Sequence, residues 1–139
     1  MSVSEIMSAR IFSADQNSSL SDIAKIMKEQ DIGAVPVCEG DRLLGIITDR
    51  DIIVRAVSEK KDLQKTLARQ VMTLDPICIE EKDSISQAAD LMAEYQVKRL
   101  PVLKSGKLVG IITLGDLAIE HLNTDQADAM SGIARGITH

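Results

Sequence analysis

Apolar residues follow a helical spacing in two separate stretches of the chain, one in each half. Residues that recur three and four positions apart fall on one face of a helix, so each stretch predicts an amphipathic helix. The residues are Leu20, Ile23, Ala24 and Met27 in the first stretch, and Ile85, Ala88, Ala89 and Met92 in the second. Both helices open with a capping-box pattern, Ser19-x-x-Asp22 and Ser84-x-x-Gln87, which sets their N-termini.

Extended segments surround each of these helices. A short one precedes each helix, near Ile11–Ala14 and Ile77–Ile79, and a hairpin follows it. The hairpins join Ala34–Val37 to Leu43–Thr48 in the first half and Arg99–Val102 to Leu108–Thr113 in the second. The proline inside the first strand of each hairpin predicts an edge strand or a strand start. A second helix is expected to begin at Thr48 and at Thr113.

The two halves are copies of one unit. Identical residues recur at a constant offset of 65, among them Met7 and Met72, Pro36 and Pro101, and Thr48 and Thr113. Such a match indicates a tandem duplication. We expect repeat 1 at 1–58, a linker at 59–70, repeat 2 at 71–122, and a tail at 123–139 that holds a short helix.

One copy is too small to bury an adequate core alone. The apolar run Leu43–Ile47 implies a strand that is covered on both faces, by helices on one side and by the sister sheet on the other. The predicted fold is therefore α/β (α+β), with two βαββα repeats packed sheet to sheet about a pseudo-twofold axis as one folded unit.

Composition narrows the possible functions. The formal net charge is −5, and the only aromatic residues are Phe12 and Tyr95, which argues against nucleic-acid binding. No apolar run approaches the length of a membrane span, and no secretory signal is evident. Cys38 and Cys78 have no CxxC spacing and are expected to be buried free thiols. We expect a soluble, cytoplasmic protein with no nucleic-acid or membrane partner.

The recurring elements Thr48-Asp49-Arg50-Asp51 and Thr113-Leu114-Gly115-Asp116 offer chemistry. Each lies where a strand ends and a helix begins, a place that favours anions. The hydroxyl could donate to a phosphate, and the carboxylate could accept from the diol of a ribose. The same pattern is also a capping box. Both interpretations stay open, and they are compatible.

Other candidates are weaker. Gly45 and Gly110 lie inside apolar strands, which suggests a bulge or a close approach, with packing of one copy on the other as the favoured cause. Lys98 and Arg99 are expected to be solvated, although one could reach an anion. No metal-ligand spacing, nucleophile elbow or Walker-type loop is present, so we expect no catalytic residues and no metal site.

These motifs resemble a tandem pair of CBS (cystathionine β-synthase) domains, or Bateman module. The resemblance rests on Ile32–Val37 with Leu44–Ile52, and on Val97–Val102 with Leu108–Leu117, in the right order at a fixed offset. It covers about Val3 to Leu122, and we expect a stand-alone pair. The resemblance implies regulatory binding of an adenosine-containing ligand (AMP, ADP, ATP, S-adenosylmethionine or NAD(H)) in two clefts between the repeats. It also implies a flat homodimer.

The resemblance further implies roles for individual residues. Asp51 and Asp116 would hold ribose hydroxyls, and Thr48 and Thr113 would approach the phosphate. The adenine pocket would be lined by the backbone of Gly33, Ala34 and Val35 and of Lys98, Arg99 and Leu100, with help from the segments around Ile11–Ser13 and Ile77–Ile79. The phosphate cations would come from Arg50, Lys98 and Arg99, with Asp49 beside them.

Our hypothesis is a cytoplasmic adenine-nucleotide sensor without catalytic activity, read by an unidentified regulated protein. The alternative is a ligand-free structural or dimerisation module in which the Thr-x-x-Asp elements only cap helices. The copies differ between their Thr and Asp, with Asp49-Arg50 in one and Leu114-Gly115 in the other. We therefore expect unequal clefts.

Overall fold

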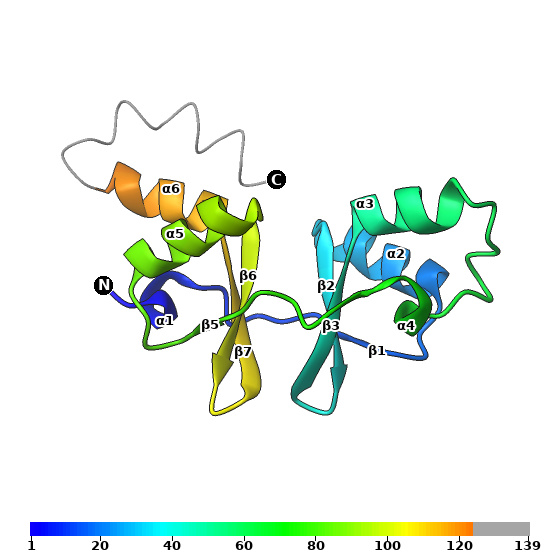
Figure 1. Cartoon of the computed structure of the whole chain (residues 1–139), viewed down its shortest axis with the longest axis horizontal. Helices are drawn as coiled ribbons and strands as arrows, with labels where there is room; N and C mark the ends of the chain where they lie inside the picture. Colours follow the sequence, from blue (N-terminus) through cyan, green and yellow to red (C-terminus); the bar gives the residue numbers. More distant parts are fainter. Residues whose placement is uncertain (124–139) are drawn as a thin grey trace. The chain divides into compact units, whose positions relative to one another are not determined.

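The computed structural model describes residues 1–123, and it contains two compact units. One unit is Phe12–Pro76, and the other joins Met1–Ile11 to the chain from Ile77 onward. Each unit holds a small sheet with helices packed on it, and the succession of strand, helix, hairpin and helix recurs in both (Figure 1). The predicted α/β fold of two βαββα repeats is confirmed. Residues 124–139, where we expected a short helix, lie outside the described residues.

The unit formed by Phe12–Pro76 contains the first hairpin and its helices. Its elements are β1 (Ala14–Asp15), α2 (Leu20–Gln30), β2 (Ala34–Glu39), β3 (Arg42–Thr48), α3 (Asp49–Ile52), the π-helical segment η1 (Ile53–Val57), α4 (Ala68–Val71) and β4 (Thr73–Leu74). The predicted first extended segment is displaced toward the C-terminus, because only Ala14 of Ile11–Ala14 lies in β1.

The other unit contains the second hairpin together with the start of the chain. Its elements are α1 (Val3–Ile6), β5 (Ile79–Glu80), α5 (Ile85–Tyr95), β6 (Arg99–Lys104), β7 (Lys107–Thr113) and α6 (Leu114–Leu122). The α6 helix is a regular α-helix, whereas its counterpart in the first copy continues as a π-helix.

The sheets share one topology. In the first, the strand order is β1-β2-β3-β4, with β1 parallel to β2 and the other pairs antiparallel. In the second, the order is β5-β6-β7, and Ser8 adds an antiparallel bridge to Ile111. The β2 strand as a whole lies inside the sheet, but Pro36 has a partner on the β3 side only, so its position is that of an edge, as predicted. The proline is tolerated there because β1 pairs with β2 only at Val37 and Cys38.

The predicted capping box is complete at Ser84, whereas at Ser19 only the serine side chain caps the helix and the Asp22 carboxylate makes no cap bond among the described residues. Ser19 Oγ accepts from the Asp22 N–H, and Ser84 Oγ accepts from the Gln87 N–H, each at 3.1 Å. Gln87 completes the second box, because its Oε1 accepts from the Ser84 N–H at 2.8 Å. The buried face of α2 is the predicted one, with Leu20, Ile23 and Met27, whereas in α5 only Ala88 and Met92 of the predicted face are buried, and Ala89 is exposed.

The glycine in each hairpin strand is approached closely by another segment. A Cβ built on Gly45 would lie 2.7 Å from Thr73 O and 2.9 Å from Met72 Sδ. On Gly110, it would lie 2.8 Å from Ser8 O and 2.5 Å from Met7 Sδ. The opening segment of each copy therefore packs on the hairpin of the other copy. A register shift beside each glycine, after Val37 and after Val102, supplies the bulge as well.

No helix among the described residues is long and apolar enough to cross a membrane.

Because the neighbour of Gly45 is backbone, Gly45→Ala should force the Thr73 segment away and lower the free energy of unfolding by about 1–3 kcal/mol. Urea denaturation measures this loss. Adding Met72→Ala removes part of the clash, so the double variant should recover stability relative to the sum of the two single losses. An unfolding free energy equal to that of the unmodified protein would contradict the close approach.

Candidate functional site

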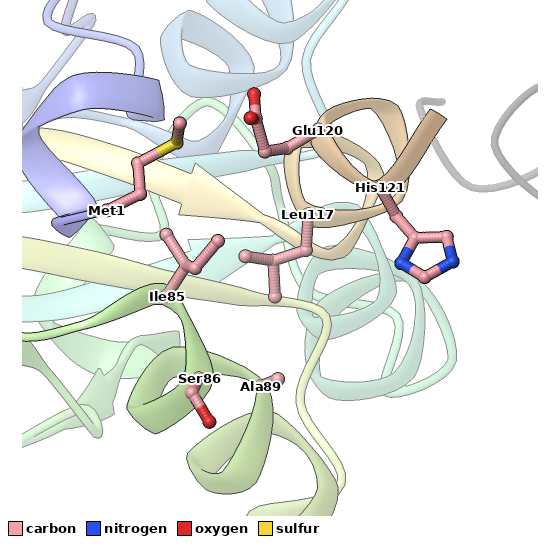
Figure 2. Close-up of a pocket in the computed structure, with 7 residues that line it drawn as sticks. All are labelled: Met1, Ile85, Ser86, Ala89, Leu117, Glu120 and His121. Atoms are coloured by element: carbon pink, nitrogen blue, oxygen red, sulfur yellow. The ribbon is translucent and has the colours of Figure 1, made fainter. Parts of the chain in front are cut away.

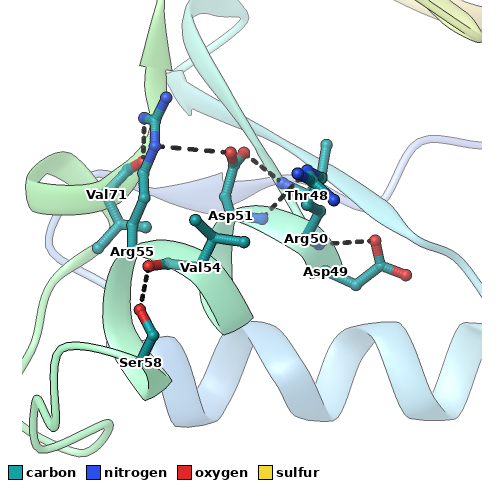
Figure 3. Close-up of polar contacts among 8 residues, drawn as sticks. All are labelled: Thr48, Asp49, Arg50, Asp51, Val54, Arg55, Ser58 and Val71. Atoms are coloured by element: carbon teal, nitrogen blue, oxygen red, sulfur yellow. Dashed lines mark hydrogen bonds and ion pairs between the residues drawn. The ribbon is translucent and has the colours of Figure 1, made fainter.

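Both Thr-x-x-Asp elements are capping boxes. The Thr48 N–H donates to Asp51 Oδ2 at 2.9 Å, and the Asp51 N–H donates to Thr48 Oγ1 at 3.0 Å (Figure 3). The Thr113 N–H donates to Asp116 Oδ2 at 2.8 Å, and the Asp116 N–H donates to Thr113 Oγ1 at 3.0 Å. The capping interpretation of these residues is therefore confirmed.

Capping leaves part of each group's bonding capacity unused. The hydroxyl of Thr48 or Thr113 accepts one hydrogen bond and keeps its own proton to donate. Each carboxylate uses Oδ2 for the backbone cap, which leaves Oδ1 outside the cap, although Asp51 Oδ1 lies near the Arg55 guanidinium. All four residues are partly exposed. Each element can therefore cap its helix and still contact a ligand, and that ligand contact stays a prediction.

Each helix start is tied to the start of the neighbouring strand. The Asp49 N–H donates to Gly33 O at 3.0 Å, and the Leu114 N–H donates to Lys98 O at 2.8 Å. The sheet register likewise pairs Ala34 with Thr48 and Arg99 with Thr113. The structure thus brings together the predicted site residues of each copy. We call these groups the first half-site (Gly33, Ala34, Val35, Thr48, Asp49, Arg50 and Asp51) and the second half-site (Lys98, Arg99, Leu100, Thr113 and Asp116).

The half-site residues differ in burial, which decides whether their side chain or only their backbone can contact a ligand. The side chains of Val35 and Leu100 are fully buried, and Ala34 is nearly so, which leaves their backbone groups as possible ligand contacts. Asp49, Arg50 and Lys98 are exposed, and Arg99 is partly exposed. Within residues 1–123, none of these three cationic side chains makes an ion pair. Arg50, Lys98 and Arg99 are therefore available to an anion.

Arg55 joins the first half-site, and our sequence analysis missed it. Its Nε lies 3.8 Å from Asp51 Oδ1, and its guanidinium donates to Val71 O at 3.0 Å (Figure 3). Its position four residues after Asp51, on the same helix face, was the available signal. The equivalent residue of the second copy is Glu120. Asp116 has no cation as close to it among the described residues.

Arg55→Gln should lower the free energy of unfolding by about 0.5–1 kcal/mol, because it removes a half-exposed ion pair and weakens the bond to Val71 O. Urea denaturation at low salt measures the loss. Arg50→Gln is the matched control, since Arg50 makes no ion pair in the described part of the chain. Equal losses of unfolding free energy in the two variants would show that the contacts of Arg55 do not stabilise the fold.

Neither Cys38 nor Cys78 forms a disulfide within the described residues, and Cys38 is buried whereas Cys78 is only partly so. Burial raises the pKa of Cys38, and it raises the pKa of Cys78 to about 11, with the charge of Glu80 adding to the effect. At neutral pH both are therefore weakly nucleophilic thiols. Residues 1–123 contain no group of three His, Cys, Asp or Glu side chains placed to hold a metal ion.

Comparison with known proteins identifies the family. The CBS domain pattern matches residues 3–58 and again residues 68–122. The chain therefore belongs to the CBS domain family, as a tandem pair. It is 34% identical over 139 residues to the CBS domain-containing protein YhcV of Bacillus subtilis (strain 168), with 99% of each chain covered.

Solved structures of the family have the same fold. Hypoxic Response Protein I, solved with two coordinated zinc ions, superposes with a TM-score of 0.79 at 33% identity, covering 86% of this chain and 98% of that one. The CBS domain pair of protein MJ0100, solved with 5'-methylthioadenosine and S-adenosyl-L-methionine, superposes with a TM-score of 0.78 at 28% identity. Here 87% of this chain and 95% of the other are covered.

Proposed function

We propose that this protein is a cytoplasmic sensor that binds an adenine nucleotide and has no catalytic activity. One observation carries the proposal. Among residues 1–123, the caps of both half-sites leave a hydroxyl proton and the carboxylate Oδ1 outside their hydrogen bonds, beside the start of a strand, and only Asp51 Oδ1 has a cation near it, Arg55. A vicinal diol donates two hydrogen bonds, and a carboxylate is the group that accepts them most strongly. The CBS pair of MJ0100, which holds two adenosine-containing ligands, supports the choice of an adenosine moiety.

The cations that make no ion pair within residues 1–123 favour a ligand that carries phosphate. Arg50 lies in the first half-site, and Lys98 and Arg99 lie in the second. Charge-assisted hydrogen bonds to phosphate are about twice as strong as neutral ones. AMP, ADP and ATP are therefore the leading candidates, ahead of S-adenosylmethionine and NAD(H). The predicted clefts between the repeats, and the predicted packing of one sheet on the other, stay predictions.

The two half-sites should bind with unequal affinity. In the first, Arg55 lies near the unused oxygen of Asp51 and competes with a diol for it. In the second, Asp116 has no such competitor among the described residues, and two cations flank the strand start. We propose that the second half-site binds more tightly, and that a regulated protein responds to its occupancy.

A thermal-shift panel of AMP, ADP, ATP, S-adenosylmethionine and NADH tests the proposal. A ligand present at 100 times its Kd should stabilise the protein by about 2.7 kcal/mol, which raises the melting temperature by several degrees. Adenosine in the same panel separates recognition of the nucleoside from recognition of the phosphate. No shift with any of these compounds would favour the ligand-free structural or dimerisation module, which the observed capping also satisfies.

Substitutions locate the site. Asp51→Asn and Asp116→Asn each keep an oxygen for the cap and remove the charge, so the fold should persist. Affinity for the ligand should fall by about 10- to 100-fold, the value of one or two hydrogen bonds to a charged group. Asp22→Asn, at the equivalent position of the α2 start, is the control outside both half-sites and should leave binding unchanged. Isothermal titration calorimetry gives the affinities, and normal binding by both site variants would remove the ribose assignment.

We also propose that the protein is a homodimer. The segment after α3 exposes three apolar side chains, Ile53 (58%), Val54 (48%) and Val57 (47%), and a neighbouring molecule that covers them would gain hydrophobic free energy. Light scattering coupled to gel filtration should give twice the chain mass of 15.1 kDa. Val54→Asp should shift the population to monomer, whereas Lys82→Asp, on an exposed turn, should not. A monomeric unmodified protein would contradict the proposal.

A further inference from the structure

Arg55 connects the first half-site to a segment that lies outside it. Its Nε is 3.8 Å from Asp51 Oδ1, and its guanidinium donates to Val71 O at 3.0 Å (Figure 3). Asp51 lies in the helix that follows β3, whereas Val71 is the last residue of α4, 16 residues further along the chain than Arg55. All three residues belong to the unit Phe12–Pro76, so both contacts are internal to one compact unit.

The carbonyl group that Arg55 binds ends a short helix. Val71 O is the last carbonyl group of α4, and the last carbonyl groups of a helix have no donor inside it. Val71 is 1% exposed, so water has almost no access to this oxygen. A buried carbonyl group without a donor is costly. The Arg55 guanidinium therefore stabilises the end of α4.

Two residues after Val71 the chain enters β4, the edge strand of its sheet. Thr73 pairs there with Ile46, and Leu74 pairs with Gly45. The strand order β1-β2-β3-β4 leaves β4 with a neighbour on one side only within the described sheet. Short edge strands with few contacts open locally at low cost in free energy. Because Leu74 is also 64% exposed, a change in β4 is accessible to another protein.

The two side chains of the ion pair differ in exposure. The side chain of Asp51 is 16% exposed, whereas that of Arg55 is 51% exposed. A half-exposed arginine has many alternative rotamers in water, and the nearby carboxylate favours the one that reaches Val71 O. A change in the charge or the bonding of Asp51 therefore changes how often Arg55 donates to Val71.

We propose that Arg55 transmits occupancy of the first half-site to β4. This coupling rests on the proposed function, because it needs a ligand whose diol donates to Asp51 Oδ1. The carboxylate oxygen is then shared, its attraction for the guanidinium falls, and the bond to Val71 O is populated less. The end of α4 loses a donor, and β4 opens more often. Binding thus loosens one edge of the sheet, and by linkage the state of β4 changes the affinity for the ligand.

The second unit has the same hairpin and the same capped helix start without this link. The counterparts of Arg55 and Val71 in the other copy, at an offset of 65, are Glu120 and Ile6. A carboxylate cannot donate a hydrogen bond to a backbone carbonyl group. The second unit is therefore an internal control for the coupling.

Glu120 lines a pocket in the second unit. The pocket lies between α5 and α6, has a volume of about 340 Å³, and is also lined by Ile85 and Leu117 (Figure 2). In the first unit, Leu63 packs against the core cluster that contains Leu20, the counterpart of Ile85. The side chain of Glu120 thus borders a pocket and does not reproduce the contacts of Arg55.

Amide hydrogen exchange of Thr73, followed by NMR in the full chain, tests the coupling without any ligand. Asp51→Asn and Arg55→Gln should each speed this exchange by about two- to fivefold, the value of a half-exposed ion pair. The two effects should not add in the double variant, because both act through the bond to Val71 O. Glu29→Gln is the matched control, since it breaks the exposed pair with Lys25 on α2, and it should leave the rate unchanged.

Saturation with AMP should also speed the exchange of Thr73. A ligand that only stabilises the folded state would slow the exchange or leave it unchanged, so the sign separates coupling from simple stabilisation. The counterpart of Thr73 is Ser8, whose N–H donates to Ile111 O at 2.9 Å, and AMP should not speed its exchange. In Arg55→Gln, AMP should bind without speeding the exchange of Thr73.

Three results would overturn the coupling. The first is one rate of Thr73 exchange in the unmodified protein, Asp51→Asn and Arg55→Gln, and the second is additive effects in the double variant. The third is AMP binding, measured by calorimetry, with unchanged or slower exchange of Thr73, which leaves the proposed function standing. An absence of AMP binding in the calorimeter counts against the proposed function instead, and the variants without ligand still decide whether Asp51 acts on β4.

Discussion

In each unit a methionine side chain and a backbone carbonyl press onto a glycine of the hairpin strand, at distances that leave no room for a Cβ. The segment that makes this contact opens one copy of the repeat, and the glycine belongs to the other copy. Met7 and Ser8 reach Gly110, and Met72 and Thr73 reach Gly45. Each unit therefore contains a piece of the sister copy, and one copy by itself lacks part of the unit. The requirement for two copies follows from this exchange.

The strand that carries the glycine leads directly to the candidate site. The β3 strand runs from the glycine contact to Thr48, and β7 runs from it to Thr113. The capping boxes at these ends fix the hydroxyl and the carboxylate by two short hydrogen bonds each. A group that is already fixed loses little conformational entropy when a ligand binds. The same side chains can therefore cap a helix and contact a ligand, and capping holds them in a fixed position before the ligand binds.

The two copies differ in the charged residue that lies near the capping aspartate and in the segment that covers the helix ends. Arg55 links Asp51 to the end of α4, which precedes the Met72 segment that packs on Gly45. The second copy has Glu120 at that position, so its carboxylate lacks the link. Likewise, Leu63 covers the ends of α2 and α3 in one unit, whereas the pocket between α5 and α6 is open in the described part of the other. The duplication gives both halves the same fold, and these differences give the two half-sites different charges.

The sequence by itself determined the duplication, the helices at Leu20–Gln30 and Ile85–Tyr95, the hairpins, and the Thr-x-x-Asp caps, because each depends on spacing or on residues close along the chain. Only the tertiary structure decided which segment presses on Gly45 and Gly110, and that Pro36 lies in an inner strand. It also showed that Arg55 joins Asp51 to Val71. These features depend on residues far apart in the chain, and their pairing is set by how the whole unit packs, which local periodicity does not encode.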